Sequence, residues 1–577
     1  MSQLAELKTV YPEYEQLQYE ALLRGIDRDT LIKFSTYLIG KDLFSGEKTE
    51  TQSLIEGWFS NGNKVFGDDM YRRIREYEQS TGKSLTVVYS ISCLKVLQYG
   101  LELAEQGLVN TKSKEQSEID LFFAMLALNQ NEDYHQTKGK AKIEAMFDER
   151  LRPAAIMLNF AFPTQDITNF NLQEYTGCQV VKFLMLFNFL EQTDTGRELI
   201  KRFCTYYDIE KWQDYIRMIF PLIMAWTGRE NAGSVDIVLD KNKDYALHLN
   251  FLKKLALSDY VKIADLDYIK LREKPLIQLD DTNFRVIHPL FIADKIYKGL
   301  FFLLKQLNDT EPPLVTNFRS WYTTNFSEGY CFNEIIKYAF NAYSARYFDD
   351  ELRALDVIGP PDCYLRYEQD VFLLENKDIF IGAGIKGAYD FENLIAEIKK
   401  KLLAEGKKPV GIGQIITNIR KLLTKANDFD QGLVVEEASI YPIIVLHDPM
   451  FDAPGLNKVM NSLYQEELAK AKADGLAVEK VTPLTLINID TLIQLAPVLK
   501  HGTITLKELL EEYFKLLNGA DEVANLTQEQ AEELERNAAL PFSIFVPNYM
   551  QSRFGDNWRS EELMGELFAK SKIDSRR

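Results

Sequence analysis

The spacing of apolar residues predicts a mainly helical N-terminal part of the chain. Apolar side chains recur at i, i+3, i+4 and i+7, the pattern of a helix with one buried face, in SLIEGWF, LKVLQYGLELAEQGL, EIDLFFAMLAL, CQVVKFLMLFNFLEQ and DYIRMIFPLIMAW. Polar stretches at 61–63 and 110–117 separate these helices. No fixed-period repeat is evident. We therefore expect one large helical region over residues 1–270, with a sensing or partner-binding role.

The pattern changes near residue 271. PLIQLD and FRVIHP flank the polar stretch Asp281-Thr282-Asn283, which predicts two strands joined by a short turn. A strongly apolar helix, LFIADKIYKGLFFLLKQL, follows. Helix, hairpin and helix in this order are compatible with a winged-helix-like module, which we place at residues 271–310.

A mixed pattern of helices and strands begins after residue 314. The two prolines in Asn308-Asp-Thr-Glu-Pro-Pro-Leu314 cannot continue a helix, so this segment is the predicted linker. We expect helices at 328–346, 388–404 and 411–424, and strands at 362–367, 371–380, 441–446 and 484–488. The fold class is thus multidomain: a large mainly α-helical N-terminal region, an α/β domain over 318–505 and a helical C-terminal tail over 506–577.

Composition narrows the class of protein. The chain has 577 residues, with 46% hydrophobic and 26% charged residues, which is typical of globular proteins. Its five cysteines show no C-x-x-C spacing, and its first residues lack the apolar core of a signal peptide. We expect a soluble, cytoplasmic protein with free thiols and no membrane partner. The net charge of −18 argues against a protein that coats nucleic acid generally, but not against a local basic groove.

The candidate chemistry lies between Gly359 and Lys377. In a strand, Glu375 and Lys377 share one face because side chains alternate. A hairpin turning at Glu368-Gln369 places Asp362 opposite Glu375, with Cβ atoms roughly 5 Å apart. Asp370 lies beside the turn and away from this pair.

Two facing carboxylates repel each other unless a cation lies between them. Mg²⁺ prefers carboxylate and water oxygens and leaves positions open for a substrate phosphate. Lys377, on the face of Glu375, is suited to orient water or to neutralise charge on the attacked phosphate. The pattern therefore favours metal-assisted phosphodiester hydrolysis.

Pro361-Asp362 and Glu375-Asn376-Lys377, separated by twelve residues, resemble the signature of the PD-(D/E)xK nuclease superfamily. The resemblance covers about residues 320–505. It implies that Asp362, Glu375 and the backbone carbonyl of Asn376 bind Mg²⁺ or Mn²⁺, and that Lys377 assists the water. It also implies an endonuclease acting on DNA, in a setting such as prokaryotic defence against phage. The sequence does not distinguish DNA from RNA.

The same resemblance points to residues outside the hairpin. A glutamate from a preceding helix often joins such a site, and Glu334 is the matching candidate. A later helix often supplies a Gln or Lys to the edge of the site, and Gln414 has that place. Tyr441 to His447 is the expected next core strand. His447-Asp448 at its end is interpreted either as a site edge or as a structural feature.

Local charge supports a phosphate-binding surface. Residues 386–425 contain nine bases and four acids inside an acidic chain. This strip favours contact with a nucleic-acid backbone. Its alternative interpretation, especially for Lys399-Lys400-Lys401, is a solvated helix face.

Two other functions remain open at this stage. A non-catalytic scaffold that binds nucleic acid or a partner would retain the fold but would have no reason to keep Asp362, Glu375 and Lys377 together. A nucleotide-dependent enzyme would use Gly382-Ala-Gly-Ile-Lys-Gly387, a G-x-G-x-x-G match that lacks the acidic residue expected about 20 positions later. For a nuclease, a homodimer is expected if both strands are cut, and a partner or ligand is expected to act through the N-terminal region.

Overall fold

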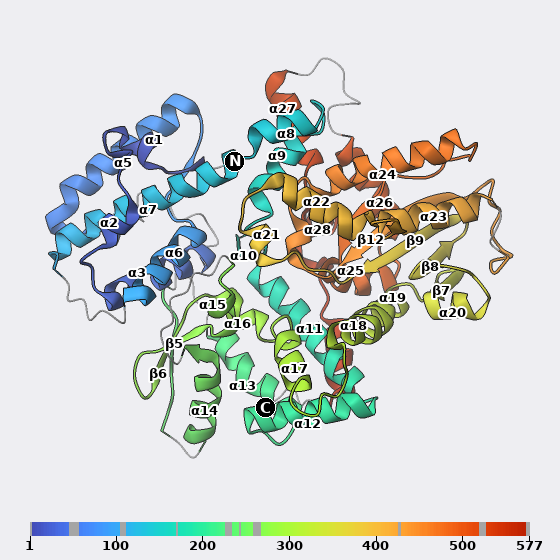
Figure 1. Cartoon of the computed structure of the whole chain (residues 1–577), viewed down its shortest axis with the longest axis horizontal. Coiled ribbons are helices and arrows are strands. Elements are labelled where there is room, and N and C mark those ends of the chain that lie inside the picture. Colours follow the sequence, from blue (N-terminus) through green and yellow to red (C-terminus); the bar gives the residue numbers. More distant parts are fainter. Residues whose placement is uncertain are drawn as a thin grey trace. The chain divides into compact units, whose positions relative to one another are not determined.

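A computed structural model describes residues 3–44, 57–103, 111–168, 171–225, 233–241, 244–257, 267–424, 428–518 and 527–572. The chain forms two compact units and is mainly helical with several small sheets (Figure 1). The first unit comprises residues 1–138, 167–179 and 200–304. The second comprises residues 139–166, 180–199 and 305–577.

These units differ from the consecutive segments expected from the sequence. Residues 139–166 and 180–199 were assigned to the N-terminal helical region, but they belong to the second unit. The reason is hydrophobic packing between segments distant in the chain. Helix α9 (Arg152–Ala161) contributes Ala154, Ala155 and Leu158 to the apolar core that the later strands and helices build. Periodicity identifies the buried face of such a helix but not the element that covers it.

Helices form most of the first unit and share one apolar core. Helix α3 (Arg28–Phe44) packs on α6 (Ser90–Glu102), and a Cβ at Gly100 would lie 2.9 Å from Leu31 Cβ, so glycine allows this close approach. The other longer helices of this unit are α5 (Lys64–Thr81), α7 (Lys114–Thr137), α13 (Trp212–Met224) and α14 (Tyr245–Leu255).

The predicted hairpin near residue 280 is present. Strand β5 (Leu276–Gln278) pairs antiparallel with β6 (Asn283–Val286), and α15 (Ile269–Glu273) and α16 (Pro289–Asp294) flank it. Strands β3 (Asp236–Val238) and β4 (Ala256–Leu257) extend it to four strands in the order β3-β6-β5-β4. The hairpin therefore forms the middle of a sheet rather than a separate wing.

A five-stranded mixed sheet organises the second unit. Its order is β13-β12-β9-β8-β7. Strands β7, β8 and β9 form an antiparallel meander, whereas β9, β12 and β13 run parallel. The bounds are β7 Ala345–Phe348, β8 Cys363–Tyr367, β9 Asp370–Lys377, β12 Ser439–Leu446 and β13 Thr485–Asn488.

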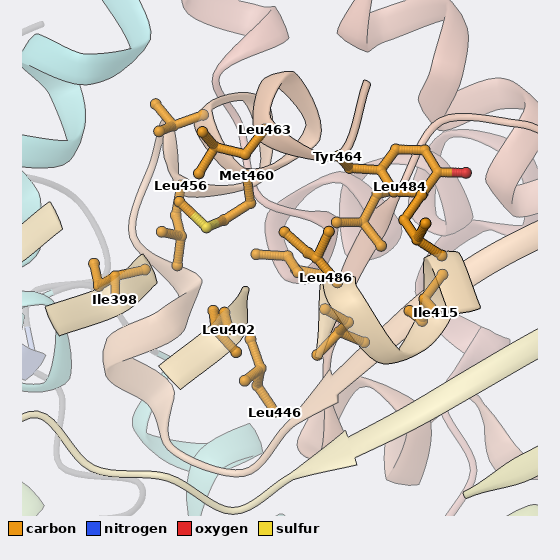
Figure 2. Packing of buried hydrophobic residues seen from close by; sticks show 14 of the residues in the cluster. Ile398, Leu402, Ile415, Leu446, Leu456, Met460, Leu463, Tyr464, Leu484 and Leu486 are labelled. Atoms are coloured by element: carbon orange, nitrogen blue, oxygen red, sulfur yellow. The ribbon is translucent and has the colours of Figure 1, made fainter. Parts of the chain in front are cut away.

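Crossover helices connect the parallel strands, as such pairing requires. Helices α22 (Phe391–Leu402) and α23 (Ile412–Leu423) lie in the chain between β9 and β12, and α24 (Leu456–Ala473) lies between β12 and β13. Figure 2 shows apolar side chains of these helices converging on the sheet. The helices contribute Ile398, Leu402, Ile415 and Met460, and the strands β12 and β13 contribute Leu446 and Leu486. These helices cover the face of β9 that carries Val371 and Leu373.

Aromatic residues and further helices cover the other face. Phe372 of β9 stacks on Tyr441 of β12 with ring centroids 4.9 Å apart. Helix α19 (Asn333–Ala339) packs against α25 (Ile489–Lys500), and α25 contacts β13. The C-terminal residues are helical, as expected, over α26 Leu506–Leu517, α27 Gln528–Ala538, α28 Phe542–Phe554 and α29 Glu562–Lys570.

Most expected elements after residue 360 are confirmed, with one clear error before it. The helix expected over 328–346 ends at Ala339, and Ala345–Phe348 form the edge strand β7. Pairing with β8 supplies backbone hydrogen bonds that local sequence preference does not reveal. All five cysteines are buried. Among the described helices, none is long and apolar enough to cross a bilayer.

Candidate functional site

The hairpin β8–β9 has the register expected from the sequence. Cys363 pairs with Leu374 and Tyr367 with Asp370, around a turn at Glu368-Gln369. In this register, the residue before β8 faces Glu375, and that residue is Asp362. Asp370 lies at the other end of β9 and pairs with Lys507 of α26 at 3.0 Å, outside the site, as predicted.

Lys377 lies between the two facing carboxylates. Its Nζ is 3.0 Å from Glu375 Oε2 and 3.5 Å from Asp362 Oδ2. Asp362 Oδ2 also accepts a hydrogen bond of 2.7 Å from the backbone N–H of Asn376. A single ammonium therefore balances two carboxylates, and the three side chains together carry one negative charge when ionised.

Burial makes this charge distribution costly. Glu375 is 0% exposed, and its Oε1 has no hydrogen-bond partner. Burial and the neighbouring charge of Asp362 raise the pKa of Glu375 well above its ordinary value, while Lys377 opposes the rise. For Lys377, burial lowers the pKa, but the charges of Asp362 and Glu375 outweigh it and raise the pKa above its usual range. Lys377 is therefore protonated at neutral pH.

Glu328 adds a third carboxylate to the electrostatics of the site. It lies on the π-helix η4 (Thr323–Phe332), which follows α18 (Phe318–Tyr322) and precedes α19. Burial, followed by the charge of Asp362, raises the pKa of Glu328 to about 7, and Lys377 acts in the opposite direction. Glu328 is thus poised to change its charge near neutral pH.

Glu334, the glutamate that the family resemblance indicates, lies on α19. Its recorded contact is an ion pair with Lys337 at 3.2 Å, on the same helix. The segment before it, residues 323–332, is a π-helix, which has more residues per turn than the 3.6 of an α-helix, so α-helical spacing does not give its buried face. The accumulation of aromatic residues around Ser327 and Glu328 was the available signal for a buried segment.

Helix α23 brings Lys421 to the loop that precedes Asp362, whereas Gln414 lies at the start of the helix. Gln414 Oε1 accepts a hydrogen bond of 3.0 Å from the backbone N–H of Gly411, which caps the start of the helix. Lys421 Nζ donates to the carbonyl oxygens of Ile358 and Gly359 at 2.5 and 2.8 Å. Burial lowers the pKa of Lys421 and the charge of Glu375 opposes this, so Lys421 belongs to the electrostatic environment of the pair.

Asn376 points to the opposite face of β9 from its two neighbours. Its side-chain Oδ1 lies 2.8 Å from His447 Nε2, at the end of β12. Burial lowers the pKa of His447 to about 4, so this histidine is neutral and donates to Asn376. Of the two interpretations of His447, the contacts favour support of the strand that carries the site.

The glycine-rich segment does not form a dinucleotide cradle. Residues 383–386 are a single helical turn, α21 (Ala383–Lys386). Lys386 is buried and pairs with Asp166 at 2.5 Å, both side chains being at most 3% exposed. The parallel neighbour of β9 is β12, which begins about 60 residues after β9 ends and lacks the spacing of a nucleotide-binding fold.

Fewer bases of residues 386–425 are available to contact a phosphate backbone than the composition of this segment suggests. Lys386 is buried, Arg420 pairs with Asp474 at 2.7 Å, and Lys401 pairs with Glu397 at 3.3 Å. Lys425 lies outside the described residues. Exposed lysines remain at 400, 407 and 408, the last two on the short hairpin β10 (Ala404–Glu405) and β11 (Lys408–Pro409).

The residues present suit a hard divalent cation. Asp362 and Glu375 supply carboxylate oxygens, and the orphaned Oε1 of Glu375 is a buried acceptor without a donor. Mg²⁺ is commonly held by one or two carboxylates, with waters and substrate phosphate completing its coordination. Across the described residues, no set of three or more His, Cys, Asp or Glu side chains is arranged to hold a metal without such help.

Comparison with known proteins does not identify the chain. No family model, no curated protein and no solved structure matches it. The geometry of the site therefore carries the functional argument.

Proposed function

We propose that this chain is a metal-dependent nuclease that hydrolyses phosphodiester bonds of DNA. The observation that carries the proposal is the carboxylate pair: Asp362 faces Glu375, and Glu375 is fully buried with one oxygen that lacks a partner. Two facing carboxylates destabilise the fold by mutual repulsion, and a bound cation removes this repulsion. Along the chain, the elements at the motif are a helix, an antiparallel meander, two helices and a parallel strand. This order is consistent with a restriction-endonuclease-like domain.

Each residue has a role that follows from its charge state. Asp362, Glu375 and the carbonyl of Asn376 would hold Mg²⁺ or Mn²⁺, which supplies Lewis-acid activation of the phosphate and of a water. Lys377 is protonated, so it serves to neutralise phosphate charge and orient the nucleophile rather than to remove a proton. Glu328, whose pKa is raised to about 7, is suited to accept the proton of the attacking water.

The test is cleavage of supercoiled plasmid, single-stranded DNA and RNA with Mg²⁺, Mn²⁺ or EDTA. We expect metal-dependent cutting of DNA that Asp362→Ala and Lys377→Ala each reduce by at least about 100-fold. Asp370→Ala is a matched control, because Asp370 is an ion-paired acid on the same strand but at its other end. It should leave cutting unchanged. Comparison of the three substrates decides between DNA and RNA.

The competing function is a non-catalytic scaffold that binds nucleic acid or a partner. The observation in its favour is that Lys377 already contacts both carboxylates, as a purely structural ion-pair network would. Calorimetry separates the two. Absence of any Mg²⁺ or Mn²⁺ binding that depends on Asp362 and Glu375 would establish the scaffold and end the nuclease proposal.

The biological setting is proposed from the family resemblance alone. We propose a role in prokaryotic defence against phage or foreign DNA, with the first unit sensing a partner protein or activating ligand. A homodimer would explain double-strand cutting, because one site cuts one strand. Phage challenge of cells expressing the wild-type chain or Asp362→Ala tests the role, and light scattering of the purified protein tests the dimer.

A further inference from the structure

Asp378, directly after the motif lysine, joins the end of β9 to the helix that carries Glu328. Its side chain is only 7% exposed. Arg319 of α18 donates to its Oδ1 at 3.0 Å and also to its backbone carbonyl. Ser327 of η4 donates to its Oδ2 at 2.6 Å. One carboxylate therefore fastens two consecutive helical segments to the strand.

Arg319 strengthens this attachment through a second contact. Its guanidinium lies over the ring of Phe380, 4.1 Å from the ring centroid. Asp378 is thus a buried carboxylate whose two oxygens accept from a guanidinium and a hydroxyl, and removal of either donor leaves part of its charge unsatisfied.

The anchored residue, Ser327, is the immediate neighbour of Glu328. A run of ten residues in π-helical geometry is unusual, since π-helices occur mostly as single turns and often at functional sites. A change of one residue in register rotates the following helix by about 100°. Such a rotation would carry Glu328 away from Asp362 and Lys377, so contacts that fix the register also fix this carboxylate.

We infer that Asp378 is a positioning residue of the nuclease site: through Ser327 and Arg319 it fixes the π-helix so that Glu328 acts on Asp362 and Lys377. This inference rests on the proposed function. It extends the motif by one residue, from Glu375-Asn376-Lys377 to Glu375-Asn376-Lys377-Asp378. The added acid contacts no substrate and acts only through Glu328.

The first measurement needs no activity. Hydrogen–deuterium exchange of the full chain, read by mass spectrometry, is compared for the wild type, Asp378→Asn, Ser327→Ala and Ser327→Thr. We expect faster exchange over residues 323–332 in the first two variants, unchanged exchange in β8 and β9, and wild-type behaviour in Ser327→Thr, which keeps the hydroxyl. Unchanged exchange over 323–332 in both Asp378→Asn and Ser327→Ala would overturn the inference, as would equal acceleration throughout the second unit.

The second measurement is a double-mutant cycle on DNA cleavage. Asp378→Asn should lower kcat by roughly 10- to 100-fold with KM within about twofold, because small displacements of a catalytic group have effects of this size. In the Glu328→Gln background the same substitution should cost nothing more. Additive losses would show a general structural role and refute the inference. Asp370→Asn serves as the control and should change neither exchange over 323–332 nor kcat.

The two measurements separate the possible failures. A wild-type chain that cuts no substrate would remove the proposed function and the catalytic part of this inference together. Hydrogen–deuterium exchange over residues 323–332 would still decide whether Asp378 anchors the π-helix. A wild-type chain that cuts DNA, with kcat unaffected by Asp378→Asn, would overturn the positioning role alone.

Discussion

Replacing Lys377 by methionine tests whether the paired carboxylates are a cation site or a self-sufficient ion network. At an effective dielectric constant of about 20, unit charges at the observed 3.0 and 3.5 Å attract by roughly 5.5 and 4.7 kcal/mol. Desolvation of the lysine offsets much of this gain. Removal of one partner from a buried pair costs roughly 3–5 kcal/mol, and we expect about 3 kcal/mol because Asp362 is partly exposed.

The free energy of unfolding that Lys377→Met loses should depend on pH and on Mg²⁺. The pKa of Glu375 is raised in the folded protein, so its ionisation opposes folding, and stability falls as pH rises above the unfolded value of about 4.3. Without Lys377 the pKa of Glu375 rises further, so this fall extends to higher pH and the deficit of Lys377→Met should be larger at pH 8 than at pH 5. A divalent cation can replace the missing charge. At ten times its Kd, bound Mg²⁺ adds about 1.4 kcal/mol.

The assay is thermal unfolding of the full chain at both pH values, in EDTA and in excess Mg²⁺. Lys377→Met should unfold at least about 5 °C below the wild type at pH 8 in EDTA, and Mg²⁺ should raise its midpoint more than that of the wild type. Lys386→Met is the matched control. It breaks another buried lysine–aspartate pair, with Asp166. It should be destabilised without recovery in Mg²⁺. A deficit in Lys377→Met that is independent of both pH and Mg²⁺ would refute the reasoning.

Three further outcomes are expected. Because the pKa of Glu328 is raised to about 7, its ionisation should cost the wild type about 2 kcal/mol of stability between pH 5.5 and 8.5, and Glu328→Gln should lose markedly less in urea unfolding at the two pH values. Gln414→Ala removes the cap of α23 and should lower the free energy of unfolding by about 1 kcal/mol with kcat unchanged. A tenfold loss of kcat would show instead that Gln414 takes part in the reaction. Asp430→Asn breaks the buried ion pair with Arg366, at 2.6 Å, and should cost about 3 kcal/mol by urea unfolding while calorimetric Mg²⁺ affinity stays the same.

The strand hairpin and its paired acids were predictable because their determinants are local. Strand periodicity, a two-residue turn and the alternation of side chains are enough to place Asp362 opposite Glu375. The crossover helices and the core strand β12 were predictable for a similar reason, since long apolar patterns specify both the element and its buried face. Local preference also placed the hairpin at residues 276–286, although not its neighbouring strands.

Tertiary structure decided what joins the site from elsewhere in the chain. Sequence periodicity did not reveal the π-helical geometry around Glu328 or the hydrogen bond from Ser327 to Asp378, about 50 residues later in the chain. The burial of Lys386 against Asp166 removes a base from the expected phosphate-binding strip. The membership of residues 139–166 in the second unit depends on which apolar faces meet. Sequence patterns report what each segment prefers alone, whereas these features arise from contacts whose free energy exists only once distant segments have packed together.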